Sequence, residues 1–142
     1  MGSITSIPDS GNTASSRTFG ACTSLIEADL STTPLTYIGV ANFVGCSSLS
    51  LIKLPSTLTS IGDWAFACGT TLASNRVYVI NATTPPTLPS GNTAVSRTLG
   101  AQDSTAMGAI YVPDGYVQTY KEAAGWSYYA NVIDSISNMP SV

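Results

Sequence analysis

The sequence predicts a solenoid, in which successive coils of the chain stack along one axis. A phenylalanine recurs at Phe19, Phe43 and Phe66, at intervals of 24 and then 23 residues. The first two are each followed by a cysteine and a leucine at the same offsets (Cys22 and Leu25, then Cys46 and Leu49). A fixed period in the twenties indicates one coil per repeat. Solenoids present extended binding surfaces along the stack, so we look for ligand contacts on an exposed ladder of side chains.

The composition agrees with a β-rich protein of one domain. Hydrophobic residues make up 44% of the 142 residues and charged residues only 9%, while serine and threonine together account for 38. Abundant threonine suits regular strands with a polar but uncharged outer face. The chain is too apolar for a disordered protein.

Charge and hydropathy exclude several classes of partner. With a net charge of −3 and five basic residues, the chain lacks the basic footprint of a nucleic-acid-binding protein. The apolar runs are too short for a transmembrane helix, and residues 1–20 lack the pattern of a signal peptide. We therefore expect either a chain that begins inside a larger secreted protein, or one that reaches the outside without a signal, as a virion component does.

Each coil is expected to contain two extended stretches. In the clearest coil, Leu49, Ile52 and Leu54 precede Pro55. Ile52 and Leu54 are two residues apart, and this alternation predicts a strand with one buried face. A second stretch buries Leu58 and Ile61 and ends at Gly62. Three other coils are expected to point matching residues inward: Leu25, Ala28, Leu30, Leu35 and Ile38; Phe66, Leu72, Val77 and Val79; Leu99, Met107, Ile110 and Val112.

Both ends of the stack differ from its middle. We expect residues 1–18 to form a partial coil with an insertion loop, residues 19–113 the coils, and residues 114–142 a carboxyl-terminal cap with a short helix and a final strand. Asp114 is the expected N-cap of that helix and Gly125 its end. Because the chain begins in mid-coil, we expect further repeats or a capping partner at the amino-terminal edge.

A loop is duplicated at an offset of 80 residues. Ser10–Ala21 and Ser90–Ala101 are identical at ten of twelve positions, and the loop part of each copy lies just before the residue that opens a coil, Phe19 or Leu99. Gly-Asn with serine and threonine is typical of a turn that satisfies its own backbone, which is one interpretation. The other is recognition of a carboxylate or a sugar by Arg17 and Arg97 beside Asn12 and Asn92, bivalently if one ligand spans both copies.

The strand ladder offers a second candidate surface. The positions expected to face outward include Asp29, Lys53, Arg76, Tyr78 and Tyr111. Asp29 and Lys53 would form a cross-strand ion pair. The two tyrosines would continue the row and could bind a sugar or a protein, although tyrosine is also common in strands for packing reasons.

The residues needed for catalysis and metal binding are missing from the sequence. Without histidine, a nucleophile–base pair would require a Ser–Lys arrangement, and no motif for one is present. The chain also lacks C-x-x-C, and equivalent cysteines on stacked coils point in parallel, which favours free thiols. We therefore expect no enzyme, no metal and no cofactor.

These patterns resemble the BspA-like leucine-rich repeats, a family of surface proteins of gut and oral bacteria. The segment Leu49–Cys68 (LSLIKLPSTLTSIGDWAFAC) carries nearly the whole repeat pattern. The closing segment is also similar in Ala82–Leu88, Ile110–Pro113, Tyr120-Lys121 and Trp126–Ala130, so the resemblance covers residues 19–136. It implies a leucine-rich-repeat solenoid of about four coils that serves as a non-enzymatic adhesion module on a bacterial cell surface and binds protein or glycan. The alternatives are a structural component of a virion and, third, an accessory domain of an enzyme.

Overall fold

The computed structural model describes residues 23–39, 42–43, 45–46, 48–67, 76–91, 98–99 and 107–140. Several predictions therefore lie outside the described residues. They concern the partial coil over residues 1–18, the loop residues Asn12, Arg17, Asn92 and Arg97, the coil residues Phe19 and Leu72, and the cysteines Cys22 and Cys68.

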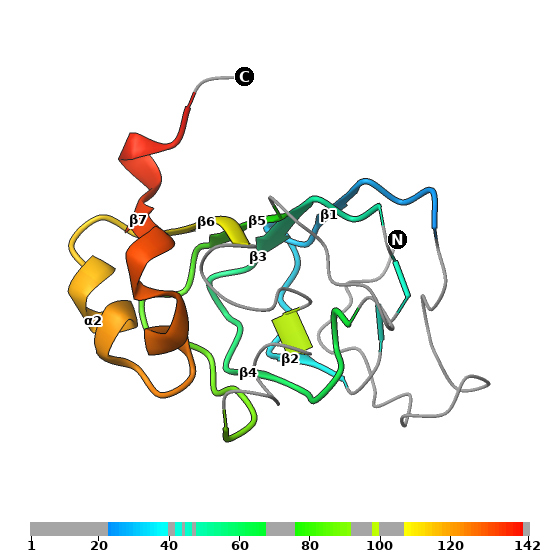
Figure 1. The fold of residues 1–142 in the computed structure, drawn as a ribbon, viewed down its shortest axis with the longest axis horizontal. Coiled ribbons are helices and arrows are strands. Elements are labelled where there is room, and N and C mark those ends of the chain that lie inside the picture. The colour runs from blue at the N-terminus through cyan, green and yellow to red at the C-terminus, as the bar shows by residue number, and fades with distance from the viewer. Residues whose placement is uncertain are drawn as a thin grey trace.

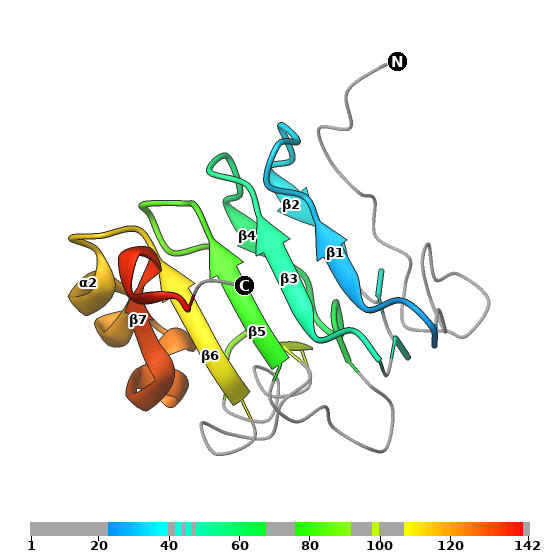
Figure 2. The same cartoon turned by 90° about the horizontal axis from the view of Figure 1, so that it is seen from above.

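The strands form two parallel ladders on opposite sides of the stack (Figures 1 and 2). The larger ladder is a five-stranded sheet in the order β1 (Glu27–Asp29), β3 (Leu51–Leu54), β5 (Arg76–Ile80), β6 (Met107–Val112) and β7 (Ile133–Ser135). The smaller ladder pairs β2 (Tyr37–Ile38) with β4 (Ser60–Ile61), and Thr87 continues it through a bridge to Ser60. The predicted solenoid of short parallel strands is confirmed.

The hydrophobic core lies between the two ladders. One row of inward side chains crosses the whole larger sheet in register: Ala28, Ile52, Tyr78, Ile110 and Ile133, all of them buried. The phenylalanines that open two coils also stack on each other, since the rings of Phe43 and Phe66 lie 5.1 Å apart at 12°. Leu99 is fully buried as the opening residue of the following coil. The sequence period therefore corresponds to vertical rows of packed side chains.

The third coil has the opposite phase from the one predicted. Val77 and Val79 were expected to point inward, with Arg76 and Tyr78 outward. In the structure Leu51 pairs with Val77 and Ile52 with Tyr78, so both valines lie on the outward side of the sheet, while Arg76 and Tyr78 are fully buried. Val77 is partly exposed there, and Val79 is covered by its neighbours and only 5% exposed. Because side chains alternate along a strand, a shift of one residue moves every side chain to the other face.

The buried Arg76 connects three successive coils. Its Nε donates to the carbonyl oxygen of Leu49 at 2.8 Å, and its Nη1 donates to those of Phe66 at 2.8 Å and Leu99 at 3.0 Å. Its Nη2 donates to the carbonyl of Cys46 at 3.3 Å. A buried guanidinium is tolerated only when its donors are satisfied, and here backbone carbonyls accept from it.

Tyr78 supports the same part of the core. Its hydroxyl donates to the Leu99 carbonyl at 2.6 Å, and its ring meets that of Phe66 edge to face at 5.7 Å. Arg76 and Tyr78 therefore converge on the carbonyl oxygen of Leu99. They fix the coil that Leu99 opens, which is a structural role.

The carboxyl-terminal segment packs against the last coils. It contains helix α2 (Val117–Glu122), the 3₁₀ segments η2 (Trp126–Val132) and η3 (Ile136–Asn138), and strand β7. Tyr120 and Trp126 are fully buried, and their polar atoms donate to the carbonyls of Ala82 at 2.7 Å and Pro86 at 2.9 Å. These bonds tie the segment to the turn that follows β5.

The ends of α2 differ from the prediction. Tyr116 occupies the N-cap position without a side-chain hydrogen bond. Asp114 instead accepts a hydrogen bond from the backbone N–H of Ser137 at 3.2 Å, and so connects the start of the segment to η3. Gly125 has a φ of 84° and precedes η2, while Ala123 caps the helix. The left-handed conformation that favours glycine lies two residues beyond the C-cap.

Cys46 is not part of a disulfide and is fully buried. No helix among the described residues is long and apolar enough to cross a bilayer.

Candidate binding surface

The outward side of the larger sheet is the surface that the sequence predicts to bind a ligand through the strand ladder. We call it the ladder face. It consists of two rows of outward residues in register: Glu27, Leu51, Val77 and Ala109, and then Asp29, Lys53, Val79, Tyr111 and Asp134. Asp29, Lys53 and Tyr111 therefore occupy one continuous row, as predicted, whereas Arg76 and Tyr78 do not belong to it.

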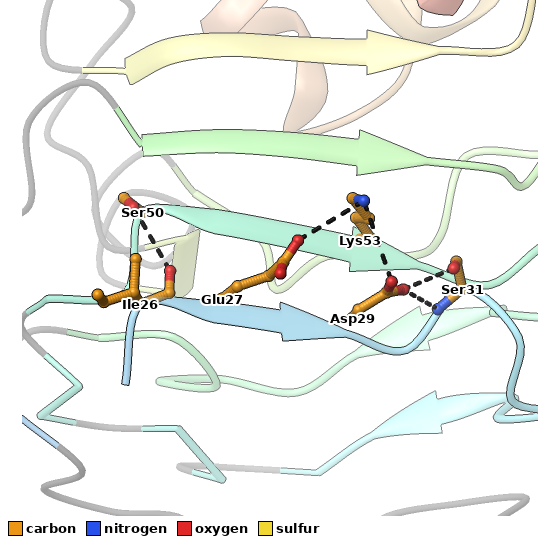
Figure 3. A network of polar contacts seen from close by, with 6 residues as sticks. All are labelled: Ile26, Glu27, Asp29, Ser31, Ser50 and Lys53. Atoms are coloured by element: carbon orange, nitrogen blue, oxygen red, sulfur yellow. Dashed lines mark hydrogen bonds and ion pairs between the residues drawn. The ribbon is translucent and has the colours of Figure 1, made fainter. Parts of the chain in front are cut away.

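An ion-pair network occupies the β1 end of the ladder face (Figure 3). Lys53 reaches from β3 to two carboxylates of β1, with its Nζ 3.6 Å from Oε1 of Glu27 and 4.0 Å from Oδ2 of Asp29. The predicted pairing of Asp29 with Lys53 is confirmed, and Glu27 joins it. All three side chains are a third to a half exposed, so the pairs contribute little to stability, about 0–1 kcal/mol each.

Asp29 is held ionised mainly by its neighbour in the chain. Its Oδ1 accepts hydrogen bonds from the Ser31 hydroxyl at 2.5 Å and from the Ser31 backbone N–H at 3.1 Å. The hydroxyl bond is the largest cause that lowers the pKa of Asp29, followed by the N–H bond, while the charge of Lys53 adds a smaller effect. This end of the face therefore sets two acidic side chains against the one ammonium group of Lys53.

The centre of the ladder face is apolar. Val77 and Val79 of β5 lie between Leu51 and Lys53 of β3 on one side and β6 on the other. The predicted row of two tyrosines is reduced to Tyr111, because Tyr78 points into the core. The chemistry of the surface changes accordingly from an aromatic row to an aliphatic patch with one aromatic ring.

The carboxyl-terminal tail turns this patch into a groove. After β7, the segment Ile136–Pro140 rises on the outer side of the sheet, opposite β2 and β4 (Figure 1), and runs back toward β5 (Figure 2). Between tail and sheet lies a hollow of about 410 Å³, which we call the tail groove. Its lining residues come from the three central strands β3, β5 and β6, from Ser50 just before β3, and from the tail: Ser50, Leu51, Lys53, Val77, Tyr111, Met139 and Pro140.

Hydrogen bonds hold the tail in this position. Asp114 accepts the N–H of Ser137, as described above, and Oδ1 of Asp134 accepts from Nδ2 of Asn138 at 2.9 Å and from the N–H of Ser135 at 2.7 Å. The bond from Asn138 is the largest cause that lowers the pKa of Asp134. Two carboxylates that serve as acceptors thus place Met139 and Pro140 opposite the ladder face.

Residues 3–82 match the BspA type leucine rich repeat region (6 copies). The match covers more than half of the chain. The chain belongs to the BspA-type leucine-rich repeat family. No curated protein matches it.

Membership in the BspA-type family gives the surface a general context. Repeat domains of this kind are usually recognition modules that mediate protein interactions, and they are generally non-enzymatic; BspA-like proteins are typically found at the cell surface. Among the residues that the structure describes, no three histidine, cysteine, aspartate or glutamate side chains come together as a metal site would require.

Several residues of the surface were not singled out from the sequence. Val77 is predicted in the core because the residues of β5 after Arg76 are apolar or aromatic at both phases, and alternation alone does not fix the orientation of the strand. Met139 and Pro140 lie beyond the last recognisable pattern, and only the folded tail brings them to β5. An outward Leu51 next to Lys53 was a usable signal, since an apolar residue on an exposed strand position indicates contact with something else.

Proposed function

We propose that this chain is a non-enzymatic recognition module that binds a protein partner through the ladder face. The observation that carries the proposal is the continuous outward row from β1 to β7, charged at the β1 end and apolar at the centre. A mixed surface of this kind, an apolar centre with a polar rim, is typical of protein interfaces. Membership in a family of recognition repeats supports the same conclusion.

The chemistry of the face favours protein over glycan. The prediction of sugar binding depends on an aromatic row formed by Tyr78 and Tyr111. With Tyr78 buried, Tyr111 is flanked in register by Val79 of β5 and Asp134 of β7. Valine and leucine side chains offer contacts to apolar groups and no hydrogen bonds to sugar hydroxyls. Apolar side chains of a protein are therefore the better match.

The setting that fits this role is the outside of a bacterial cell, where an adhesion module meets its partner. The family supports this, because BspA-like proteins are typically surface proteins. The duplicated loop, with Asn12, Arg17, Asn92 and Arg97, stays a prediction for a second contact.

A binding array tests the proposal. The wild-type chain is applied to an array of glycans and random twelve-residue peptides, beside a ladder variant, E27A/D29A/A109E, whose three changes lie outside the tail groove. Tyr128→Ser, an exposed cap residue, is the matched control. We expect peptides to be retained by the wild type and the control and lost by the ladder variant. Peptide binding that the ladder variant retains would contradict the proposal, as would binding to glycans alone.

A further inference from the structure

We infer that the tail groove accepts one apolar side chain of the protein partner, presented next to a basic side chain that contacts Glu27 and Asp29. This inference rests on the proposed function and specifies it further. The partner's apolar side chain would lie in the tail groove of the ladder face, and its positively charged side chain would lie beside the two carboxylates.

The walls of the groove suit an apolar side chain. Leu51 and Val77 provide aliphatic surface from the sheet, and Tyr111 adds an aromatic ring. Lys53 also lines the groove, but its ammonium is paired with the carboxylates of β1, so its methylene stem is the part left for the groove. Most of the lining is therefore apolar.

The groove is large enough to hold a side chain of the partner. Pockets for whole small ligands measure about 300–1,000 Å³, and the tail groove, at about 410 Å³, lies near the lower end and is open to solvent. It has room for one large side chain such as leucine, methionine or phenylalanine. Met139 adapts its shape to such a guest more readily than a branched residue, because its unbranched side chain has several rotatable bonds.

The charge beside the groove selects the neighbouring residue of the partner. Glu27 and Asp29 share the single ammonium of Lys53, so the β1 end of the face has an excess of negative charge. Both carboxylates are about half exposed and can approach a further cation. A lysine or arginine next to the apolar residue would be attracted there, whereas an acidic residue would be repelled.

A second copy of this chain is a poorer occupant than a basic partner. The chain has a net charge of −3, with eight acidic and five basic residues. Bringing two such molecules together opposes like charges at the acidic end of the ladder face. The partner chemistry that complements the groove and its rim is therefore a basic and apolar protein segment.

Short peptides provide the probe. Four fluorescein-labelled nonapeptides differ only at their central pair, Arg-Leu, Arg-Ser, Glu-Leu or Glu-Ser, within a Gly/Ser sequence, and fluorescence anisotropy measures their affinity for the chain. We expect Arg-Leu to bind best. Replacing the leucine should weaken binding about tenfold or more, the effect of losing one buried aliphatic side chain. Replacing the arginine should weaken it about two- to fivefold at low salt, and less at high salt.

Variants of the protein localise the effect. Val77→Asp places a charge in the groove, and Met139→Ser shortens its wall while leaving the buried core intact; both should reduce Arg-Leu binding. Tyr128→Ser is the control and should not. Circular dichroism verifies that Val77→Asp folds, and the Met139 variant keeps the test valid if it does not. Sedimentation velocity is run in parallel to detect self-association.

The outcomes separate this inference from the proposed function. If the ladder variant loses the array peptides while Val77→Asp and Met139→Ser bind them normally, the inference about the tail groove is wrong and the proposal for the ladder face stands. If no peptide depends on any of these residues, both are wrong. Equal affinity for Arg-Leu and Glu-Ser would overturn the partner chemistry. A dimer that Val77→Asp abolishes would overturn it in favour of a second copy of this chain.

Discussion

Replacing Arg76 by methionine should strongly destabilise the protein. Methionine keeps much of the unbranched stem but removes all the donors of the guanidinium. Arg76 is fully buried and donates to four carbonyls of three successive coils. The substitution therefore leaves the packing largely filled and isolates the hydrogen bonds.

The magnitude follows from the acceptors that lose their donor. The Leu99 carbonyl retains the hydroxyl of Tyr78, and the Cys46 carbonyl retains the backbone N–H of Leu49 at 3.2 Å. The carbonyls of Leu49 and Phe66 lose the bonds that the guanidinium donates to them. Depriving a buried acceptor of its partner costs about 1–3 kcal/mol, so we expect Arg76→Met to lower the free energy of unfolding by about 2–4 kcal/mol. That is a large share of the roughly 5–15 kcal/mol typical of a domain.

Urea unfolding followed by tryptophan fluorescence measures the change. With a slope of about 2 kcal/mol per molar urea, the midpoint should fall by about 1–2 M. Lys53→Met is the matched control, because it removes a partly exposed cation from the neighbouring strand, and it should change the unfolding free energy by less than about 1 kcal/mol. Equal midpoints for both variants would refute the role assigned to Arg76.

Three further predictions concern single groups. Tyr78→Phe should lower the free energy of unfolding by about 1–2 kcal/mol in the same urea assay. Because Tyr78 and Arg76 both donate to the Leu99 carbonyl, the double variant with Arg76→Met should lose more than the sum of the two single variants. Strict additivity would contradict the shared acceptor. Ser31→Ala should raise the pKa of Asp29 toward its ordinary value in a carbon-13 titration of the carboxyl group, and an unchanged pKa would contradict the bond. Because the folded pKa of Asp29 is lowered, its contribution to stability is present above about pH 4 and is lost as the pH falls through the folded value. The buried Cys46 should resist iodoacetamide in the native protein and react after denaturation, as mass spectrometry would show; native alkylation would contradict its burial.

Much of the fold could be predicted because the coils repeat. The spacing of Phe43 and Phe66 gave the period, and the alternation of Ile52 and Leu54 gave the inward face of β3; the structure stacks the rings and buries both aliphatic residues. Register between strands followed from the period, so the pairing of Asp29 with Lys53 was predictable from the sequence. Repeated local patterns specify such a stack because each coil mainly contacts its neighbours.

The orientation of β5 could not be predicted in the same way. Its residues after Arg76 are all apolar or aromatic, so both faces look equally buried, and a charged side chain at its start suggests exposure. Only tertiary contacts reveal that the guanidinium finds carbonyl acceptors in neighbouring coils. The tail groove was hidden for a related reason, since Met139 and Val77 lie 62 residues apart in the sequence and no repeat relates them.

The most direct test of the central claim is to map where a bound peptide touches the chain. The tightest array peptide is titrated into nitrogen-15-labelled protein, and amide chemical shifts are followed. The account predicts that the largest shifts cluster at Leu51, Val77, Ala109 and Tyr111 on the ladder face, with small ones at Tyr116 and Tyr128 in the cap. Shifts that cluster around Tyr116 and Tyr128 and leave the ladder face unchanged would contradict it.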